Sequence, residues 1–360
     1  MTTAAVTVLI LAPEPVAGAG PLARLLDDAR TVLAARHRDA FLATGATSAL
    51  IHREPADDTP FGTRLGRLVR ELRPAGLVVL GAGSIPLATT GDLRAFMDAA
   101  AADVPGALAN SFHSADAVAV ACAAIALKDL PADLSGDNAL PRWLAEVAGV
   151  HVRDLRARRD LAVDVDSPLD LLLLEDAVPG IPLPGGTAAE PVRSRLAALR
   201  GVARDPGAEL LVAGRTAAAD LARIERDTRA RTRVLIEERG LRTASLAASR
   251  GRPNRRQPRS LLGDLLDRDG PGALGELAAR FSDGALIDTR VLLAARLGAD
   301  ERAWPVPEDR YASDLLLPDH ISDPWLRALT ASALTSPIPV LLGGHTLVGP
   351  GARLALGIGA

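Results

Sequence analysis

The stretch LAVDVDSPLDLLLL, residues 161–174, combines an apolar run with two acidic residues that stand one position apart. The segment Leu161–Val165 predicts a short buried strand. Asp164 and Asp166 occupy positions i and i+2, so both side chains would leave such a strand on the same face. Paired carboxylates at the carboxyl end of a strand favour a Mg²⁺ or Mn²⁺ site, because hard cations prefer oxygen ligands. The alternative is a helix cap plus one solvated aspartate.

A helix is predicted directly after these aspartates. Ser167 suits the N-cap, Pro168 fits the first turn, and Asp170 places a negative charge three residues after the cap. Strand, carboxylates and helix together form the repeating pattern of an α/β sheet. The same alternation extends in both directions along the chain. Other predicted strands lie at residues 6–12, 48–52, 76–83, 116–120, 208–214 and 232–240.

The chain of 360 residues is long enough for two domains. We expect an α/β fold with a three-layer, Rossmann-like N-terminal domain over residues 1–178. A stretch rich in proline and glycine predicts a linker over residues 179–191. Residues 192–360 restart the α/β pattern and predict a second, smaller α/β domain.

Composition excludes several classes of protein. The formal net charge of −3 argues against a nucleic-acid binder. The single cysteine, Cys122, excludes a disulfide framework and a CxxC metal site. No apolar run reaches the roughly 18 residues that a membrane span needs. The first apolar stretch lacks the basic flank of a signal peptide, so we expect a cytoplasmic protein.

Three stretches resemble small guanylyltransferases of the GT-A type, namely the molybdenum-cofactor and phospholactate guanylyltransferases. They are PFGTRLGRLVRELRPAGLVVLGAGSIPLATTGDLRAFM at 60–97, ANSFHSADAVAV at 109–120, and DVDSPLDL at 164–171. The first is similar to the family's helix, strand and G-x-D-x-P-L segment. The third is similar to its late D-x-D-[ST]-P-x-D-L motif. The resemblance covers about half of the chain.

The resemblance implies a nucleotidyltransferase that moves a nucleoside monophosphate from an NTP to a small phosphorylated or hydroxylated acceptor, releasing pyrophosphate. Asp164 and Asp166 match the late carboxylates and would serve as catalytic residues and as ligands of Mg²⁺ or Mn²⁺. The partners would be the NTP and the small-molecule acceptor. The residues expected to bind the nucleotide or acceptor are Gly81, Ser84, Asn110, His113 and Asp116.

Departures from the family pattern support a second hypothesis. The loop after the first strand reads PEPVAGAG, and Glu14 places negative charge where a triphosphate would lie. Ser84 stands in place of the family's metal-binding aspartate, and a hydroxyl is a poorer Mg²⁺ ligand than a carboxylate. Either Asp116 or Asp137 substitutes for that aspartate, or the domain is catalytically degenerate and acts in binding or regulation.

The second half has its own candidate site and no recognised family. In LIDTRVLL, an Asp-Thr-Arg segment inside an apolar strand is costly unless its members are paired or serve a site. In LLGGHTLVGPG, the polar residues follow a buried strand, where ligands often bind. An active site in this half is therefore a third hypothesis, with Asp288, Arg290, His345 and Thr346 as its candidates.

The alternative for these residues is structural. It consists of a tight turn and an internal ion pair between Asp288 and either Arg290 or Arg310. Asp309 and Asp314 lie in a neighbouring polar segment and would join either arrangement.

Overall fold

The computed structural model describes residues 4–55, 57–134, 136–239 and 257–359, and they form two compact units. Unit 1 comprises the described residues within 4–18 and 27–164, and unit 2 those within 19–26, 165–239 and 257–359. The boundary thus falls directly after Asp164. Helix α7 begins at Gly186, inside the stretch 179–191 that composition predicted as a linker.

Unit 1 is built on a six-stranded sheet with the order β2-β1-β3-β5-β4-β6. β5 runs antiparallel to both of its neighbours, and the pairs β1–β2, β1–β3 and β4–β6 are parallel. The central strands are buried on both faces, as expected for a sheet covered on both sides. The strands are β1 (Val6–Pro13), β2 (Ser48–Glu54), β3 (Gly76–Gly81), β4 (Gly106–Ala109), β5 (Ala117–Ala121) and β6 (His151–Asp154).

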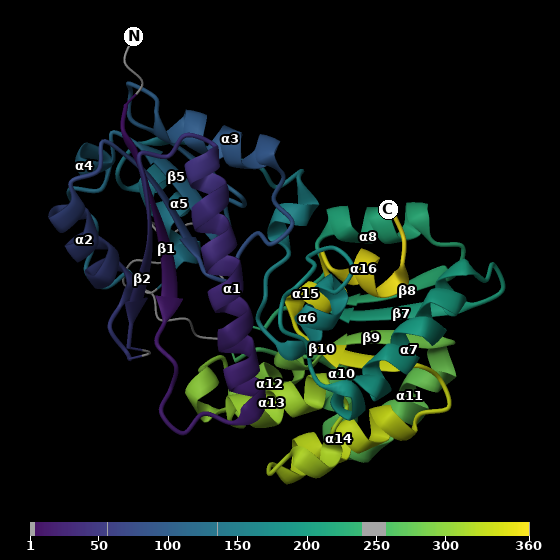
Figure 1. Cartoon of the computed structure of the whole chain (residues 1–360). Helices are drawn as coiled ribbons and strands as arrows, with labels where there is room; N and C mark the ends of the chain where they lie inside the picture. The colour runs from purple at the N-terminus through teal and green to yellow at the C-terminus, as the bar shows by residue number, and fades with distance from the viewer. Residues whose placement is uncertain (1–3, 56, 135, 240–256, 360) are drawn as a thin grey trace. The chain divides into compact units, whose positions relative to one another are not determined.

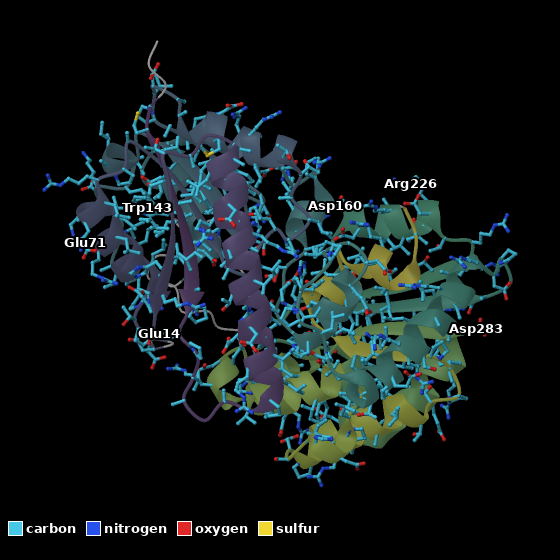
Figure 2. All side chains as sticks on the ribbon, in the orientation of Figure 1. Glu14, Glu71, Trp143, Asp160, Arg226 and Asp283 are labelled. Atoms are coloured by element: carbon cyan, nitrogen blue, oxygen red, sulfur yellow. The ribbon has the colours of Figure 1, made fainter. Side chains whose placement is uncertain are left out.

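Helices cover the two faces of this sheet, so unit 1 has three layers (Figure 1). One face packs against α2 and α5, where Trp143 is 4% exposed (Figure 2). The other packs against α1 and α3 through Phe41 and Phe96. The helices are α1 (Pro21–Ala43), α2 (Phe61–Leu72), α3 (Thr90–Ala100), α4 (Ala123–Ala126) and α5 (Leu140–Glu146), with 3₁₀ turns η1 (Asp137–Ala139) and η2 (Arg159–Ala162).

Unit 2 is built on a four-stranded parallel sheet with the order β10-β9-β7-β8. Its strands are β7 (Glu209–Gly214), β8 (Arg231–Ile236), β9 (Gly284–Asp288) and β10 (Val340–Gly343). The helices described around it are α6 (Pro168–Leu174), α7 (Gly186–Arg204), α8 (Ala218–Asp227), α10 (Leu261–Asp269), α11 (Leu274–Phe281), α12 (Thr289–Leu297), α13 (Pro307–Asp314), α14 (Pro324–Thr335), α15 (His345–Val348) and α16 (Ala352–Leu356), with η3 (Pro271–Ala273), η4 (Glu301–Ala303) and η5 (Pro318–His320).

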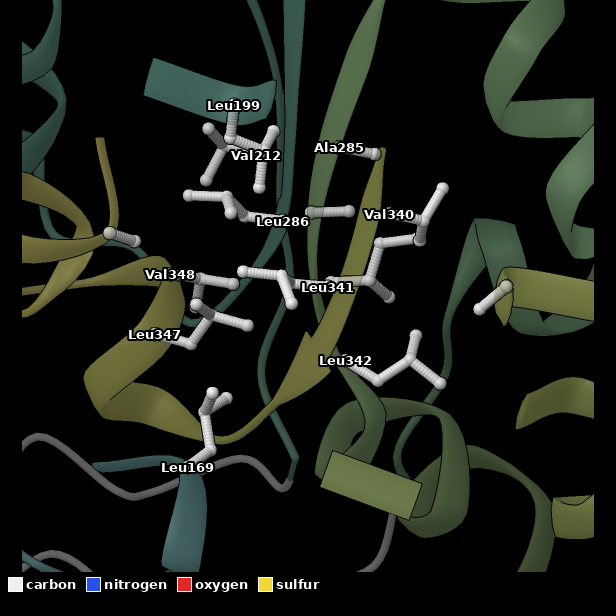
Figure 3. Packing of buried hydrophobic residues seen from close by; sticks show 14 of the residues in the cluster. Leu169, Leu199, Val212, Ala285, Leu286, Val340, Leu341, Leu342, Leu347 and Val348 are labelled. Atoms are coloured by element: carbon white, nitrogen blue, oxygen red, sulfur yellow. The ribbon is translucent and has the colours of Figure 1, made fainter. Parts of the chain in front are cut away.

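The core of unit 2 is aliphatic and continuous from its sheet to the covering helices. Figure 3 shows Leu199 of α7 beside Val212 of β7, and Leu347 and Val348 of α15 beside Leu341 of β10. Each of these five side chains is at most 1% exposed. The carboxyl ends of the parallel strands are therefore held on a buried aliphatic base.

Two sequence predictions are wrong in their secondary structure. Leu161–Val165 is not a sheet strand: its first residues lie in η2, and Asp164 forms one isolated bridge with Ser84. The burial of Leu161, Val163 and Val165 that the pattern predicted is real, and Leu161 packs in the core on one face of the unit 1 sheet. The segment Asp288–Arg290 does not lie inside a strand either. Asp288 is the last residue of β9, Thr289 and Arg290 begin α12, and the Asp288 side chain caps this helix by accepting a hydrogen bond from the Arg290 N–H.

The predicted helix after the aspartates is confirmed. α6 begins at Pro168, and the Asp170 carboxylate accepts hydrogen bonds from the backbone N–H groups of Asp166 and Ser167 at 3.0 and 2.8 Å. None of the helices in the described part of the chain is both long and apolar enough to cross a membrane.

Candidate functional sites

One edge of the unit 1 sheet collects most of the residues predicted for the first domain. In register, Leu11 of β1 lies opposite His52 of β2 and Gly81 of β3. Asn110 directly follows β4, and Asp116 directly precedes the antiparallel β5, which brings both to the same edge. β1 has β2 on one side and β3 on the other, so this is the point where the strand order reverses. Ligands of open α/β sheets bind at such points.

Two adjoining cavities open at this edge, beside the carboxyl ends of β1 and β2. Their volumes are about 370 and 260 Å³. Both are lined by His52, Glu54, Thr59 and Arg64. The larger is further lined by Arg53, Pro55, Asp57, Thr63 and Arg67, and the smaller by Leu11, Ala12, Pro13 and Phe61.

Charged side chains of β2 and α2 converge in these cavities. The Glu54 carboxylate pairs with Arg67, with Arg64 at 3.4 Å and with the ring of His52 at 2.9 Å. Arg64 also donates to the Asp57 carboxylate at 2.6 Å. Burial, followed by the nearby Arg67 charge, lowers the pKa of His52. The side chains of Arg64 and Arg67 are 22% and 47% exposed, so both guanidinium groups remain within reach of a ligand.

Asn110 organises the next part of the edge. Its side-chain oxygen accepts hydrogen bonds from the backbone N–H groups of Asp116 and Ala117, at 3.0 and 3.2 Å. Its amide group donates to the Leu161 carbonyl at 2.9 Å and to the Asp116 carboxylate at 3.3 Å. The side chain is almost fully buried. Asn110 therefore holds the segments before β5 and before Asp164 in place.

Ser84 lies at the same edge and is held by a buried histidine. The Ser84 carbonyl accepts a hydrogen bond from Nε2 of His37 at 2.8 Å. Burial lowers the pKa of His37 to about 4, so the ring is neutral at neutral pH. The Ser84 hydroxyl lies 2.7 Å from the point that a Cβ on Gly81 would occupy, and Ser84 forms the bridge with Asp164. Gly81, Ser84, Asn110, Asp116 and Asp164 are thus joined into one cluster.

The remaining predicted residues of the first half lie differently. His113 is exposed and packs edge-on against Phe112, with ring centroids 4.9 Å apart. Asp166 is exposed and belongs to unit 2, whereas Asp164 is half-buried and belongs to unit 1. Within the described ranges, no group of three or more His, Cys, Asp or Glu side chains is arranged to hold a metal ion.

Unit 2 gathers buried charges at the carboxyl ends of β7 and β9. Arg215 directly follows β7 and donates two hydrogen bonds to Asp288 at the end of β9, at 2.6 and 3.2 Å. The Asp288 side chain is fully buried, and that of Arg215 is 15% exposed. Burial alone would raise the pKa of Asp288, but the Arg215 guanidinium, with Arg290 and His345, holds it below its usual value.

A second buried ion pair lies beside the first. Nη1 and Nη2 of Arg290 donate to the two carboxylate oxygens of Asp314, and Nη1 also donates to Thr289. Burial opposes the positive charge of Arg290, but Asp314 and Asp288 raise its pKa overall, so it stays protonated. The predicted pairing of Asp288 with the side chain of Arg290 or Arg310 is therefore wrong. Arg310 instead pairs with Glu301 at 3.0 Å.

Asp170 is a further buried carboxyl of unit 2, and its pKa lies near neutral pH. Burial raises its pKa to about 7, and the charges of Asp166 and Asp314 act in the same direction. The carboxyl is therefore partly protonated at neutral pH. Burial also raises the pKa of Asp314, against the opposing charge of Arg290, whereas Arg215 holds the pKa of Asp288 below its usual value.

The loop after β10 adds His345 and Thr346 to the same edge. His345 is partly exposed, whereas Thr346 is buried. Nε2 of His345 and a carboxylate oxygen of Asp220 lie 3.4 and 3.5 Å from the point that a Cβ on Gly349 would occupy. The Thr216 hydroxyl donates to the Val348 carbonyl at 2.9 Å and ties the start of α8 to this loop.

The start of α1 is already occupied by a carboxylate. Residues 19–26 belong to unit 2, and there the backbone N–H groups of Leu22 and Ala23 donate to the two oxygens of Glu308 at 2.9 and 3.1 Å. Helix starts of this kind commonly bind phosphate. Here the Glu308 carboxylate occupies the position that a bound phosphate would take.

Sequence reasoning missed several members of these sites. Arg64 and Arg67 stand three residues apart on one helix, and this spacing after the polar end of β2 could have indicated the cavity. Arg215 follows an apolar strand and could have been found in the same way as His345. Asp220 and Glu308 left no comparable signal, because their partners are distant in the sequence.

No protein-family model matches the chain, and no curated protein matches it.

Proposed function

We propose that unit 1 is a nucleotidyltransferase-like domain that binds an NTP at the carboxyl edge of β1 and β2. The observation that carries the proposal is the pair of open cavities at the strand-order reversal, with Arg64 and Arg67 on their walls. Guanidinium groups bind phosphate oxygens with paired hydrogen bonds. Phe61, in the smaller cavity, offers an aromatic surface of the kind on which bases stack.

The acceptor would bind at the neighbouring cluster of Ser84, Asn110, Asp116 and Asp164. A phosphate or hydroxyl oxygen of the acceptor would attack the α-phosphorus of the NTP. The bond to the bridging oxygen breaks, and pyrophosphate leaves. Such reactions depend on positioning and charge stabilisation, with little covalent help from the protein.

Asp164, the member of the predicted pair that belongs to unit 1, is the proposed protein ligand of Mg²⁺ or Mn²⁺. Mg²⁺ is usually held by one or two protein carboxylates together with substrate phosphates and water. The bound ion would neutralise charge on the departing pyrophosphate.

A second candidate function is nucleotide binding without transfer. One observation favours it: Ser84 stands where the guanylyltransferases that this half resembles have a metal-binding aspartate. Both functions require NTP binding at the same edge. They differ in whether pyrophosphate is released.

The test is calorimetric titration of the full chain with ATP, GTP, CTP and UTP, each with Mg²⁺ or Mn²⁺. Arg67→Gln is expected to weaken binding by roughly tenfold to a hundredfold, because it removes a charged hydrogen-bond donor. Arg70→Gln, an exposed change on the same helix, is the matched control and should bind as the wild type does. Equal affinity of the two variants, or no binding of any NTP, would overturn the proposal.

Metal dependence is tested in the same titrations. Asp164→Asn is expected to remove the effect of Mg²⁺ on affinity, and the exposed Asp129→Asn of the same unit to preserve it. Pyrophosphate release on adding candidate acceptors supports transfer. Metal-dependent binding with no release across phosphorylated and hydroxylated acceptors supports the binding function.

A further inference from the structure

The unit 2 sheet contains a reversal of strand order of the kind beside which small ligands bind. β7 has β8 on one side and β9 on the other, so the strand order reverses between β7 and β9. All strand pairs in this sheet are parallel, and ligands of such sheets bind outside the carboxyl ends at that position. Arg215 and Asp288 follow or end the two strands concerned.

The two arginines at this edge are held in fixed positions. Asp288 binds Arg215 through Nε and Nη2, and Asp314 binds Arg290 through Nη1 and Nη2. The hydrogen bonds that orient Arg290 thus do not use its Nε. Burying such pairs is often no better for stability than apolar packing. Their distinctive effect is to fix the direction of the guanidinium groups.

Gly344 lies between these two guanidinium groups. A Cβ at this position would lie 3.8 Å from Nε of Arg290 and 4.0 Å from Nη2 of Arg215. Its backbone angles are φ −109° and ψ −158°, which any residue can adopt. No contact within the unit would be closer than these, so neither the backbone nor the packing requires glycine. A ligand lying over the backbone here would require it.

We propose that this edge binds the oxyanion group of a small molecule, a phosphate or a carboxylate, over Gly344 and between Arg215 and Arg290. Guanidinium groups whose planes are fixed by buried carboxylates are preorganised to donate to such oxygens. His345 directly follows Gly344, is partly exposed, and supplies a further polar group at the rim. This site is separate from the NTP site proposed in unit 1 and does not depend on it.

The test compares two glycine-to-alanine variants of the full chain. Gly344→Ala places a methyl group in the proposed anion position without a steric clash. Gly201→Ala in α7, where a Cβ would meet nothing within 4 Å, is the matched control. Melting curves establish that both variants fold. Each protein is then titrated with inorganic phosphate and with acetate at constant ionic strength.

The wild type and Gly201→Ala are expected to bind one of the two anions, and Gly344→Ala to bind it at least about tenfold more weakly. Tighter binding of phosphate assigns a phosphorylated ligand, and tighter binding of acetate a carboxylate. The proposal is overturned if neither anion binds the wild type, or if Gly344→Ala binds as well as the control. If Arg67→Gln loses anion binding while Gly344→Ala retains it, the anion binds in unit 1, and this result also overturns the proposal.

Discussion

The carboxyl edges of the two sheets begin from the same strand arrangement but are filled in opposite ways. In each unit the first strand lies between the second and the third, so the order reverses at one place. In unit 1 that edge carries two cavities and partly exposed ion pairs around Glu54. In unit 2 it carries ion pairs whose carboxylates, Asp288 and Asp314, are fully buried.

The comparison indicates that the strand order determines where a site can lie in each unit. How deeply the charged side chains are buried then determines how much of that edge a ligand can reach. The ion pairs around Glu54 are partly exposed, so they contribute less to stability than buried pairs lose when broken, and Arg67 remains open to a ligand. Buried pairs are costly to break, so the charged side chains at the edge of unit 2 are held in fixed positions. We therefore propose a ligand as large as a nucleotide for unit 1 and a small anion for unit 2.

The largest effect expected from this comparison is on Arg290. Arg290→Gln leaves the buried Asp314 carboxylate without its charge partner, and the free energy of unfolding is expected to fall by about 3–5 kcal/mol. Arg296→Gln, on the same helix α12, breaks an exposed pair with Asp267 and the contact of its guanidinium with the Trp325 ring, whose centroid is 5.2 Å away, and should cost only about 1 kcal/mol. Denaturant unfolding measures both. Similar losses in the two variants would remove the contrast between buried and exposed pairs.

Asp170 provides a pH-dependent test of the buried edge. Its folded pKa of about 7 lies above the unfolded value, so the folded state binds the proton more tightly. The stability contribution is present at low pH and is lost as pH rises toward 7. We expect a loss of about 3 kcal/mol between pH 5 and pH 8. Asp170→Asn, which retains an acceptor for both backbone N–H groups, should lack this loss.

The measurement is the free energy of unfolding of wild type and Asp170→Asn across that pH range. A constant difference between the two proteins at all pH values would show that Asp170 is ionised throughout. In that case the buried edge of unit 2 would be less apolar than its burial indicates.

His37 tests the anchoring of Ser84 in unit 1. Its folded pKa of about 4 lies below the unfolded value, so the unfolded state binds the proton more tightly. The stability contribution is full at pH 7 and is lost as pH falls below about 6.5. We expect a loss of about 2 kcal/mol from pH 7 to pH 5, absent in His37→Gln, which keeps a donor for Ser84. The exposed His151→Gln is the control, and it should retain the full pH dependence.

Local signals in the sequence predicted much of the fold and part of the site. The apolar runs gave the main strands, and Ser167, Pro168 and Asp170 gave the start of α6, because such signals act within a few residues. The apolar run at 284–297 was misread, since a buried strand followed by a buried helix has no distinguishing periodicity.

The pairing of buried charges could not be predicted from the sequence. Arg215 and Asp288 are 73 residues apart, and Arg290 and Asp314 are 24 apart. Several arginines and aspartates of the second half were equally eligible as partners, and only the folded sheet selects among them. Gly81, Ser84, Asn110 and Asp116 were predicted together from the family resemblance, and the fold brings them to one edge of the unit 1 sheet.

The central claim is that the open edge of unit 1 is the nucleotide site and the filled edge of unit 2 is not. Hydrogen–deuterium exchange of the full chain, with and without the tightest-binding NTP and Mg²⁺, tests it directly. The account predicts slowed exchange in peptides that cover His52–Arg67 and Gly81–Ser84. Protection confined to Gly214–Thr216, Asp288–Arg290 and Gly343–Thr346 would contradict it and place the nucleotide in unit 2.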